Sequence, residues 1–526
     1  MITLTKKQSL LLAIVFAAGL FALKAVFLWT APIRGLGITT WIIDDTFIIA
    51  RVARNIALGY GFTYDFTHAT TGAPPLWTYI TSINHLLFPS LETAMKMTFI
   101  ETAFLGSLAT LVVFFIARKL SESEEVAWIS LVLSSLTANA FFEAMNGMDT
   151  SLFTLSAVLS FALYLGVFRP KHVSESTWAA LTGLVIGFTC LVRGDGIFVL
   201  ATIGLVELIG ILKAKTGQKI RLLNLVLLCL VAVSCVGLLI GWQMVRTGTP
   251  LLGNQVGRRE LAMSLHGFDF GNFVIMKYLK IVVWNVFQID RLVDIATGSS
   301  VFAIFALLGG WLIPKLRTLA LLTVMYIVIF FGLLATYQWY FPDLHGLRYV
   351  NPAVHLLFIF IGGCIASLPP LPMRKIASWA VVAAIIILSH YWFYDYVSHL
   401  AWAKGMTYTG HATKADEQAS WATIDWVKDN LPKGTVVGVR DHGRFALFSD
   451  LPTQDLAGNI DPTVPLLART EGLAAYLKSR KVAYVLIPSL ETRQDLIYRV
   501  LFGELNLRLV REAPGYRGTQ LYKVIW

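Results

Sequence analysis

Charged residues are scarce in this chain of 526 amino acids: Asp, Glu, Lys and Arg make up 14% and hydrophobic residues 56%. The mean hydropathy is +0.66. Soluble globular domains carry roughly 25% charged residues, so this balance excludes an ordinary soluble protein. The composition predicts a protein that crosses a membrane many times.

Cysteine is also scarce, with four residues in the whole chain: Cys190, Cys229, Cys235 and Cys364. All four lie within apolar stretches and none shows the spacing of a metal ligand, so neither a disulfide framework nor a zinc site is expected. The chain also lacks internal repeats and low-complexity stretches of note. We interpret the cysteines as small core residues.

Apolar segments recur along the chain. A transmembrane helix needs about 20 apolar residues, and about eleven segments qualify. They centre on residues 9–29, 96–117, 126–142, 150–168, 178–192, 197–212, 222–243, 299–314, 318–336, 351–368 and 376–393. The first is long and no small-residue cleavage pattern precedes the residues that follow it, so we interpret it as a retained helix and not as a cleaved signal.

Basic patches fall at every second connection between these segments and predict the topology. They are Lys6–Lys7, Arg118–Lys119, Arg169 with Lys171, residues 213–221, Lys315 with Arg317, and Arg374–Lys375. We therefore expect a cytoplasmic N-terminus, with residues 143–149, 193–196, 244–298, 337–350 and everything after about 394 on the outer side. Because much of the net charge of +11 lies in these patches, no nucleic-acid partner is expected.

Several arginines on the predicted outer side do not follow this rule: Arg51, Arg54, Arg193, Arg246, Arg258, Arg259 and Arg348. Basic residues on the disfavoured side call for an anionic partner there. The alternative for each is a contact with a lipid headgroup or a structural pair with Asp.

From about residue 395 the composition changes to that of a soluble domain. Residues 421–430 have the pattern of an amphipathic helix, and 435–439 that of a strand. A second helix is expected at 471–480, a second strand at 483–487 and a last strand at 520–525. Alternating helices and strands predict a small α/β domain over 395–526, behind a membrane domain over 1–394. The predicted domain shows no Gly-rich phosphate loop.

Asp44 and Asp45 stand side by side just after the first apolar segment. Two adjacent carboxylates repel each other and are costly to desolvate at a membrane surface, so a reaction centre or a metal site is the first hypothesis. The alternative is a solvated loop or a helix N-terminus, where Asp is favourable. Residues 46–58 have a helical pattern within a first outer loop at 30–95, which places the pair at the start of a helix.

The motifs around this pair resemble a known family. Asp44-Asp45, the stretch from Arg51 through Arg54-Asn55 to Gly59 and Gly61, and Pro75-Leu-Trp77 look like those of membrane-embedded glycosyltransferases of the GT-C class. The resemblance extends to residues 146–153, 191–196, 248–254, 345–352, 441–448 and 455–461. It is closest to the terminal arabinofuranosyltransferases of mycobacterial cell-wall synthesis and to related bacterial enzymes, including pilin-modifying ones. Asp149 stands where the family has Glu, and Gly194 where it has Pro.

The resemblance implies a polytopic α-helical fold and a glycosyltransferase in the cytoplasmic membrane of a bacterium. Such enzymes take a sugar, here suggested to be arabinofuranose, from a polyprenyl-phosphate donor. They transfer it to a polysaccharide, lipid-linked glycan or pilin on the outer face of the membrane. The leaving lipid phosphate needs fixed cations and the acceptor hydroxyl needs a base. Membrane lipid is a further expected partner.

We therefore expect Asp44 to be the base and Asp45 its partner, which positions sugar hydroxyls or helps to hold a divalent cation such as Mg²⁺, Mn²⁺ or Ca²⁺. No other cofactor is suggested. Arg348, Arg193 and Arg258 are expected to bind the donor phosphate. The expected substrate-binding residues are Arg51, Asn55, Asp149, Asp195, Asn254, His345 and Trp77.

Alternatives stay open for several of these residues. Asp195 is also placed to pair with Arg193. His345 and His442 lack metal-ligand spacing, and Trp77, Tyr337, Trp339 and Tyr340 have the pattern of an interfacial belt as well as of sugar-stacking rings.

Two other functions compete with the enzyme. A transporter or flippase for a lipid-linked sugar also needs many helices, but the charges gather at one surface and the halves show no repeat. A membrane anchor for a binding domain would not need about eleven helices.

Overall fold

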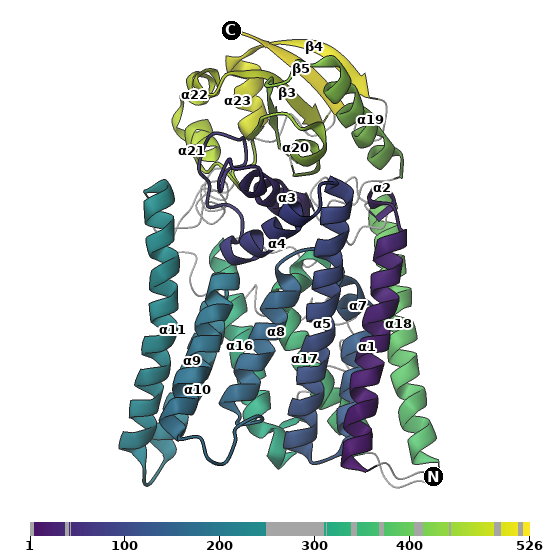
Figure 1. Ribbon diagram of the computed structural model, residues 1–526, viewed down its shortest axis with the longest axis vertical. Coiled ribbons are helices and arrows are strands. Elements are labelled where there is room, and N and C mark those ends of the chain that lie inside the picture. The colour runs from purple at the N-terminus through teal and green to yellow at the C-terminus, as the bar shows by residue number, and fades with distance from the viewer. Residues whose placement is uncertain are drawn as a thin grey trace.

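Long helices standing side by side form the lower part of the molecule, and a sheet with short helices forms the upper part (Figure 1). The computed structural model describes residues 5–36, 42, 44–248, 310–311, 313–337, 344–367, 373–403, 414–440, 443–488, 496–513 and 519–526. The N-terminus lies at the lower end of the helices, and the C-terminus at the top of the sheet.

The lower helices come from the chain between Lys6 and Ala403. They are α1 (Lys6–Thr30), α5 (Leu91–Ser121), α6 (Glu124–Leu136), α7 (Ala138–Glu143), α8 (Thr150–Tyr164), α9 (Glu175–Val192), α10 (Gly196–Lys213), α11 (Gln218–Thr247), the short 3₁₀ helix η3 (Pro314–Leu316), α16 (Arg317–Tyr337), α17 (Leu344–Ala366) and α18 (Arg374–Ala403). Hydroxyl side chains cap several of their N-termini: Ser90, Ser123 and Ser174 each accept a hydrogen bond from a backbone N–H three residues on. Such caps satisfy donors that a helix start leaves unpaired.

Six of the described helices are long and apolar enough to cross a bilayer: Lys6–Thr30, Leu91–Ser121, Glu175–Val192, Gly196–Lys213, Gln218–Thr247 and Arg374–Tyr391. Thr150–Tyr164 and Asn351–Ala366 are shorter apolar helices. The protein is therefore a multi-pass membrane protein, while the expected number of about eleven spans stays a prediction.

The expected span at 126–142 is interrupted, which corrects the sequence interpretation. Thr137 has an extended backbone with ψ of 145° and separates α6 from α7. The first backbone N–H beyond the break, that of Ala138, donates to the hydroxyl of Ser389 in α18 at 3.2 Å. A side chain from a neighbouring helix thus satisfies a donor at the new helix start.

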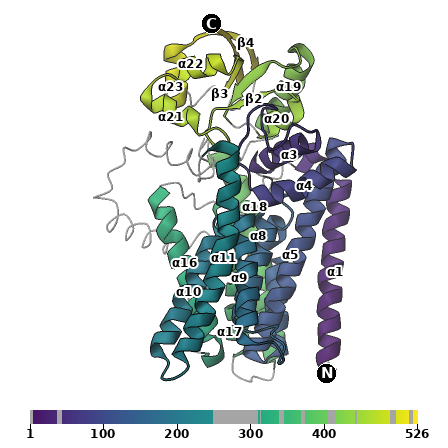
Figure 2. The ribbon, with the colours of Figure 1, turned by 60° about the vertical axis from the view of Figure 1, so that its left-hand side comes forward.

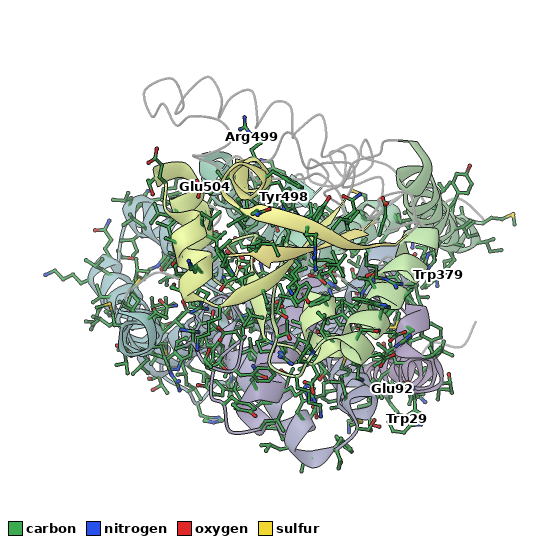
Figure 3. All side chains as sticks on the ribbon, turned by 90° about the horizontal axis from the view of Figure 1, so that it is seen from above. Trp29, Glu92, Trp379, Tyr498, Arg499 and Glu504 are labelled. Carbon is green, nitrogen blue, oxygen red and sulfur yellow. The ribbon has the colours of Figure 1, made fainter. Side chains whose placement is uncertain are left out.

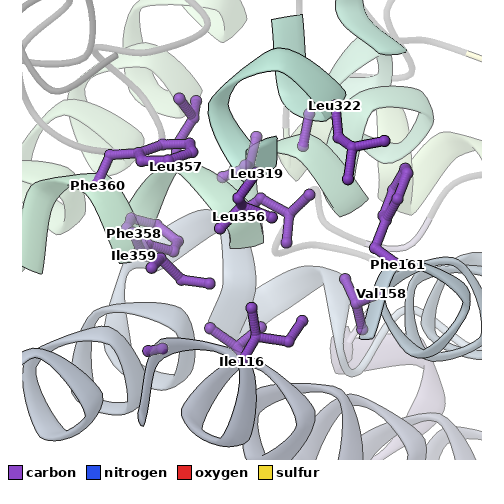
Figure 4. Packing of buried hydrophobic residues seen from close by; sticks show 14 of the residues in the cluster. Ile116, Val158, Phe161, Leu319, Leu322, Leu356, Leu357, Phe358, Ile359 and Phe360 are labelled. Atoms are coloured by element: carbon purple, nitrogen blue, oxygen red, sulfur yellow. The ribbon is translucent and has the colours of Figure 1, made fainter. Parts of the chain in front are cut away.

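The core of the helical part joins helices that are far apart in sequence. Figure 4 shows Ile116 of α5, Val158 and Phe161 of α8, Leu319 of α16 and Leu356 of α17 packed against one another, all fully buried. In a bilayer such contacts stabilise mainly by van der Waals packing, because lipid tails are as apolar as these side chains.

The expected first outer loop forms a layer of short helices between the two parts, as Figures 1 and 2 both show. It contains α2 (Ile33–Leu36), α3 (Asp44–Ala57) and α4 (Pro75–Leu87). The helical pattern predicted for 46–58 is confirmed by α3, and Asp44 and Asp45 lie in its first turn. Helix α3 packs against α4 below and against α20 of the upper part above.

We call residues 414–526 the C-terminal region. Its elements are α19 (Lys414–Asn430), β1 (Val436–Val439), α20 (Gly443–Ser449), β2 (Thr453–Asp455), α21 (Thr463–Thr470), α22 (Leu473–Ser479), β3 (Val482–Pro488), α23 (Leu496–Glu504), β4 (Asn506–Ala513) and β5 (Thr519–Ile525). The five strands form one sheet in the order β2-β1-β3-β5-β4. β1 pairs in parallel with β2 and β3, whereas β5 is antiparallel to β3 and β4.

The elements expected at 421–430, 435–439, 471–480, 483–487 and 520–525 are confirmed by α19, β1, α22, β3 and β5. Figure 3 looks down on this region, with Tyr498, Arg499 and Glu504 of α23 beside the sheet and Trp29 and Trp379 at the rim of the molecule. Helix α18 runs unbroken to Ala403, past the domain boundary expected at 394/395, so that boundary stays a prediction.

Candidate active site

A cavity of about 130 Å³ lies where the first outer loop, the upper ends of the lower helices and the C-terminal region meet. Both polar and apolar residues line it. The polar side chains are Asp45, Asp149, Arg193, Asp195, Arg348 and Asn459; the rest of the lining is Ile48, Ile49, Gly72–Pro75, Met148, Cys190–Val192, Gly194 and Leu239. Convergent charges in a mostly apolar pocket are the usual form of a ligand site.

Asp45 and Arg348 form an ion pair in this cavity, although 303 residues separate them in sequence. The Arg348 guanidinium donates to the Asp45 carboxylate at 2.9 Å, and its other terminal nitrogen lies 3.3 Å from the sulfur of Met148. The side chain of Asp45 is 29% exposed and that of Arg348 only 7%. The carboxylate therefore faces the open part of the cavity.

Arg193 forms the second charged group of the cavity. It lies between α9 and α10, where it donates to Asp195 at 2.8 Å and approaches the Asp149 carboxylate at 3.7 Å. The guanidinium also lies 5.4 Å from the centre of the Phe153 ring. The pairing of Arg193 with Asp195, one of the two alternatives for Asp195, is thus present. Asp149, at the start of α8, is a second acidic neighbour of Arg193.

Two buried carboxyl groups stand at or beside this cavity. Burial raises the pKa of Asp149 against the opposing effect of Arg193 and Arg348, and one of its carboxylate oxygens has no hydrogen-bond partner among the described residues. Burial also raises the pKa of Glu143 to about 8. Glu143 accepts a hydrogen bond from Asn146 at 2.7 Å. Desolvation disfavours the ionised form of both groups.

Asp44, the expected base, does not line the cavity. Its carboxylate accepts hydrogen bonds from the backbone N–H groups of Gly443 at 2.7 Å and Arg444 at 2.9 Å, at the start of α20. Successive residues of a helix point about 100° apart, so Asp44 faces upward to the C-terminal region while Asp45 faces the cavity. Asp44 thus acts as a helix cap, as the alternative interpretation of the pair expected. The helix that it caps is α20 and not its own helix α3.

Arg51 and Asn55 are also absent from the cavity lining, and both hold the chain that follows α3. Arg51 is completely buried; it donates to the carbonyls of Tyr64 at 3.2 Å and Leu451 at 3.1 Å. Asn55 donates to the carbonyl of Thr63 at 3.0 Å. Buried polar groups need such partners, so these two expected substrate-binding residues occupy structural positions.

Trp77 is buried too, and its indole N–H donates to the carbonyl of Gly147 at 3.1 Å. It does not line the cavity. Arg258, Asn254, Trp339, Tyr340 and His442 lie outside the described residues, and only the backbone of Tyr337 and His345 is described.

The carboxylates of the cavity do not fit a divalent-cation site. Asp45 is paired with Arg348, and Asp149 and Asp195 flank Arg193. In the part of the chain that the structure describes, no group of three or more His, Cys, Asp or Glu side chains is placed to hold a metal ion. Metal sites for hard cations need several converging oxygen ligands, which these paired carboxylates do not offer.

Sequence reasoning missed Met148, Glu143 and Asn459. Asn459 belongs to the family-like motif at 455–461, but no local pattern indicates that this loop reaches a cavity lined mainly by residues 45–195. The gathered chemistry is two arginines, three acidic side chains and one amide beside an apolar wall. This set can neutralise an anion, accept a proton and bind hydroxyl groups.

The family model of dolichyl-phosphate-mannose-protein mannosyltransferases matches residues 62–246. This segment includes Asp149, Arg193 and Asp195 of the cavity. A model of a domain of unknown function matches residues 407–524. No curated protein sequence matches the chain.

Solved structures share the fold. An oligosaccharyltransferase from Archaeoglobus fulgidus, solved with Zn and sulfate, is 14% identical with a TM-score of 0.58, over 98% of this chain and 72% of that one. The oligosaccharyltransferase AglB of the same organism, in complex with an inhibitory peptide and a dolichol-phosphate, is 13% identical with a TM-score of 0.55, over 92% and 71%.

The arabinofuranosyltransferase AftD from Mycobacteria is 15% identical with a TM-score of 0.48, over 99% of this chain and 40% of that one. The family match over residues 62–246 and the shared fold agree with the expected class: the chain is similar to membrane glycosyltransferases over that segment and has the fold of the oligosaccharyltransferases.

Proposed function

We propose that the protein transfers one sugar from a polyprenyl-phosphate donor to a hydroxyl group of an acceptor at the cavity beneath the C-terminal region. The observation that carries this proposal is the Asp45–Arg348 ion pair beside Arg193. It combines a partly exposed carboxylate with two guanidinium groups. A phosphate leaving group and an acceptor hydroxyl require those two kinds of group.

The donor phosphate binds Arg348 and Arg193, whose planar guanidinium groups match phosphate oxygens. It replaces Asp45 as a partner of Arg348, which leaves the Asp45 carboxylate available to the acceptor. The acceptor oxygen then forms a bond with the anomeric carbon while the bond from that carbon to the phosphate oxygen breaks. The acceptor proton moves to Asp45, and polyprenyl phosphate leaves with its negative charge held by the two arginines.

Asp45 takes the role of base in this proposal in place of Asp44, because Asp44 is bound by backbone N–H groups away from the cavity. The apolar wall from Cys190 to Val192, with Leu239 of α11, faces the first isoprene units of the donor. Dolichol-phosphate in the AglB complex and the mannosyltransferase match are consistent with this donor class.

The finer assignments rest on the sequence motifs. They favour arabinofuranose as the sugar, and a polysaccharide, lipid-linked glycan or pilin as the acceptor. They also favour the cytoplasmic membrane of a bacterium, with the C-terminal region and the cavity on the outer side. A transporter or flippase is not favoured, because the charged cavity residues lie at one end of the helices, where the C-terminal region packs on α3.

The test uses the full-length chain in lipid nanodiscs with synthetic polyprenyl-phosphate sugars, and it measures polyprenyl phosphate release together with glycosylated product. Asp45→Asn keeps the shape of the side chain and removes its basicity. We expect the transfer rate to fall by about 10² to 10⁴, the usual contribution of a general base.

Asp425→Asn is the matched control, because Asp425 pairs with Arg34 at 2.7 Å on the exposed surface away from the cavity. Exposed pairs contribute little, so this variant should transfer sugar at the wild-type rate. Wild-type transfer by Asp45→Asn would remove Asp45 as the base. Failure of the wild-type protein to use any polyprenyl-phosphate sugar, although folded, would contradict the function itself.

A further inference from the structure

One part of the cavity lining comes from a loop of the C-terminal region, 220 residues or more beyond the cavity residues of the first outer loop and helices α8 to α11. This loop runs from Asp455, at the end of β2, to Asp461. Within this loop, Asn459 lines the cavity.

A single carboxylate holds this loop in shape. One oxygen of Asp455 accepts hydrogen bonds from the backbone N–H groups of Ala457 at 2.6 Å and Gly458 at 3.1 Å, and the other from Ile460 at 2.6 Å and Asp461 at 3.0 Å. The carboxylate of Asp455 accepts all four of these hydrogen bonds, and the carboxamide of Asn459 takes no part in them. Hydrogen bonds to a charged acceptor are the strong ones, so the loop is a fixed wall.

The first outer loop meets this wall at close range. Thr70 donates its hydroxyl hydrogen to the carbonyl of Ile460 at 3.1 Å. Gly72 lies so near that a methyl group added to it would collide with the Asn459 carbonyl and come within 2.8 Å of the Ile460 Cα. Only glycine permits such an approach of two backbones, and it fixes Asn459 relative to the rest of the cavity.

The chemistry of Asn459 differs from that of the other polar cavity residues. A carboxamide offers two N–H donors and one oxygen acceptor without net charge. The guanidinium groups of Arg348 and Arg193 bind phosphate better than a carboxamide does. A carboxamide instead matches the hydroxyl groups of a sugar, each of which is both a donor and an acceptor. The sugar is attached directly to the phosphate, so a neutral wall residue in the same small cavity lies beside the sugar.

We infer that Asn459 is a specificity-determining residue, which binds hydroxyl groups of the sugar being transferred and so selects it. This inference rests on the proposed function for the identity of the ligand. It assigns to the C-terminal region a part in reading the donor, in addition to covering the cavity.

The test measures binding of soluble donor fragments, so that it does not depend on turnover. A panel of pentose and hexose 1-phosphates that differ in single hydroxyl groups is titrated against the full-length protein in nanodiscs, with inorganic phosphate as the reference probe. We expect the wild type to prefer one sugar. Asn459→Leu should lose about tenfold in affinity for that sugar through its lost hydrogen bonds and keep its affinity for inorganic phosphate.

Asn430→Leu is the matched control, since Asn430 is exposed at the end of α19 and its side chain bonds only within its own helix. It should keep the wild-type preference. An unchanged preference in Asn459→Leu, or no preference in the wild type, would overturn the inference. Neither result contradicts the proposed function, provided that transfer from polyprenyl-phosphate sugars is observed. Absence of transfer would contradict the proposed function, whatever the binding test shows.

Discussion

Asp44 and Asp45 occupy the first turn of α3, yet their carboxylates face different partners. Asp44 receives two backbone N–H groups of α20, and Asp45 receives the guanidinium of Arg348. The residue types were enough to predict a pair of acidic groups at a helix start beside a membrane. Which of the two faces a cavity depends on the direction of the helix axis, and tertiary packing sets that direction.

Glu143 allows a test of burial at the scale of one residue. Its ordinary pKa of 4.5 is raised to about 8, chiefly by desolvation. In the folded protein the group is therefore protonated at pH 7, whereas in the unfolded chain it is ionised. A raised carboxyl pKa stabilises the fold fully below pH 4.5, and this contribution is lost as the pH rises through about 8.

Glu143→Gln keeps an acceptor for Asn146 and removes the ionisable group. We expect the thermal unfolding temperature of this variant to exceed that of the wild type above pH 8 and to match it near pH 4.5. Unfolding in detergent micelles across this range measures the difference. If the two curves remain parallel at all pH values, Glu143 is ionised in the fold.

At the scale of elements, α3 is the part that joins the membrane helices to the C-terminal region. Arg54, in the last turn of α3, donates to Asp450 at 2.8 Å, and Asp65, in the chain that follows α3, pairs with Arg480 at 2.8 Å. The helical pattern of α3 and the ranges of β1, β3 and β5 were predictable, because each has a clear apolar period. The three-residue strand β2 and the break at Thr137 depend on neighbouring elements and carry no such signal.

The closeness of α3 and α20 predicts the effect of one methyl group. A Cβ at Gly443 would collide with the Asp44 carbonyl and lie 2.9 Å from the Ile48 side chain. Gly443→Ala should therefore push α20 away from α3 and cost about 1 to 3 kcal/mol, as overpacking usually does. Thermal unfolding and limited proteolysis of the C-terminal region would measure it.

Gly503→Ala provides the comparison, because Gly503 lies in α23 with nothing near the position of an added Cβ. Alanine is the better helix former by roughly 0.5 to 1 kcal/mol, so this variant should be slightly more stable than the wild type. Equal stability of the two alanine variants would show that α20 does not press on α3.

At the scale of the whole molecule, the helices have two unlike ends. One end carries the N-terminus, and the other carries the cavity and the C-terminal region (Figure 2). The sequence indicated this separation through its alternating basic patches. The contact between Asp45 and Arg348 could not be predicted from the sequence, because contacts between residues hundreds of positions apart depend on packing and not on local pattern.

The topology is the prediction that belongs to this scale. A reporter that works only in the cytoplasm should be active when it is fused at residue 120 or 216. A reporter that works only on the outer side should be active when it is fused at residue 526. The positive-inside rule is the physical reason, since basic loops resist translocation. A cytoplasmic position for residue 526 would reverse the orientation of the cavity.

The 399 residues between Asp44 and Gly443 also set a delay in biosynthesis. Synthesis proceeds at about 5 to 20 residues per second, so α3 waits roughly 20 to 80 s after its own translation before α20 exists. During that interval the wall that bears Asn459 is missing, while the early helices already occupy the bilayer. On the proposed function, a nascent chain therefore lacks the residue that selects the sugar until the loop at 455–461 has been made.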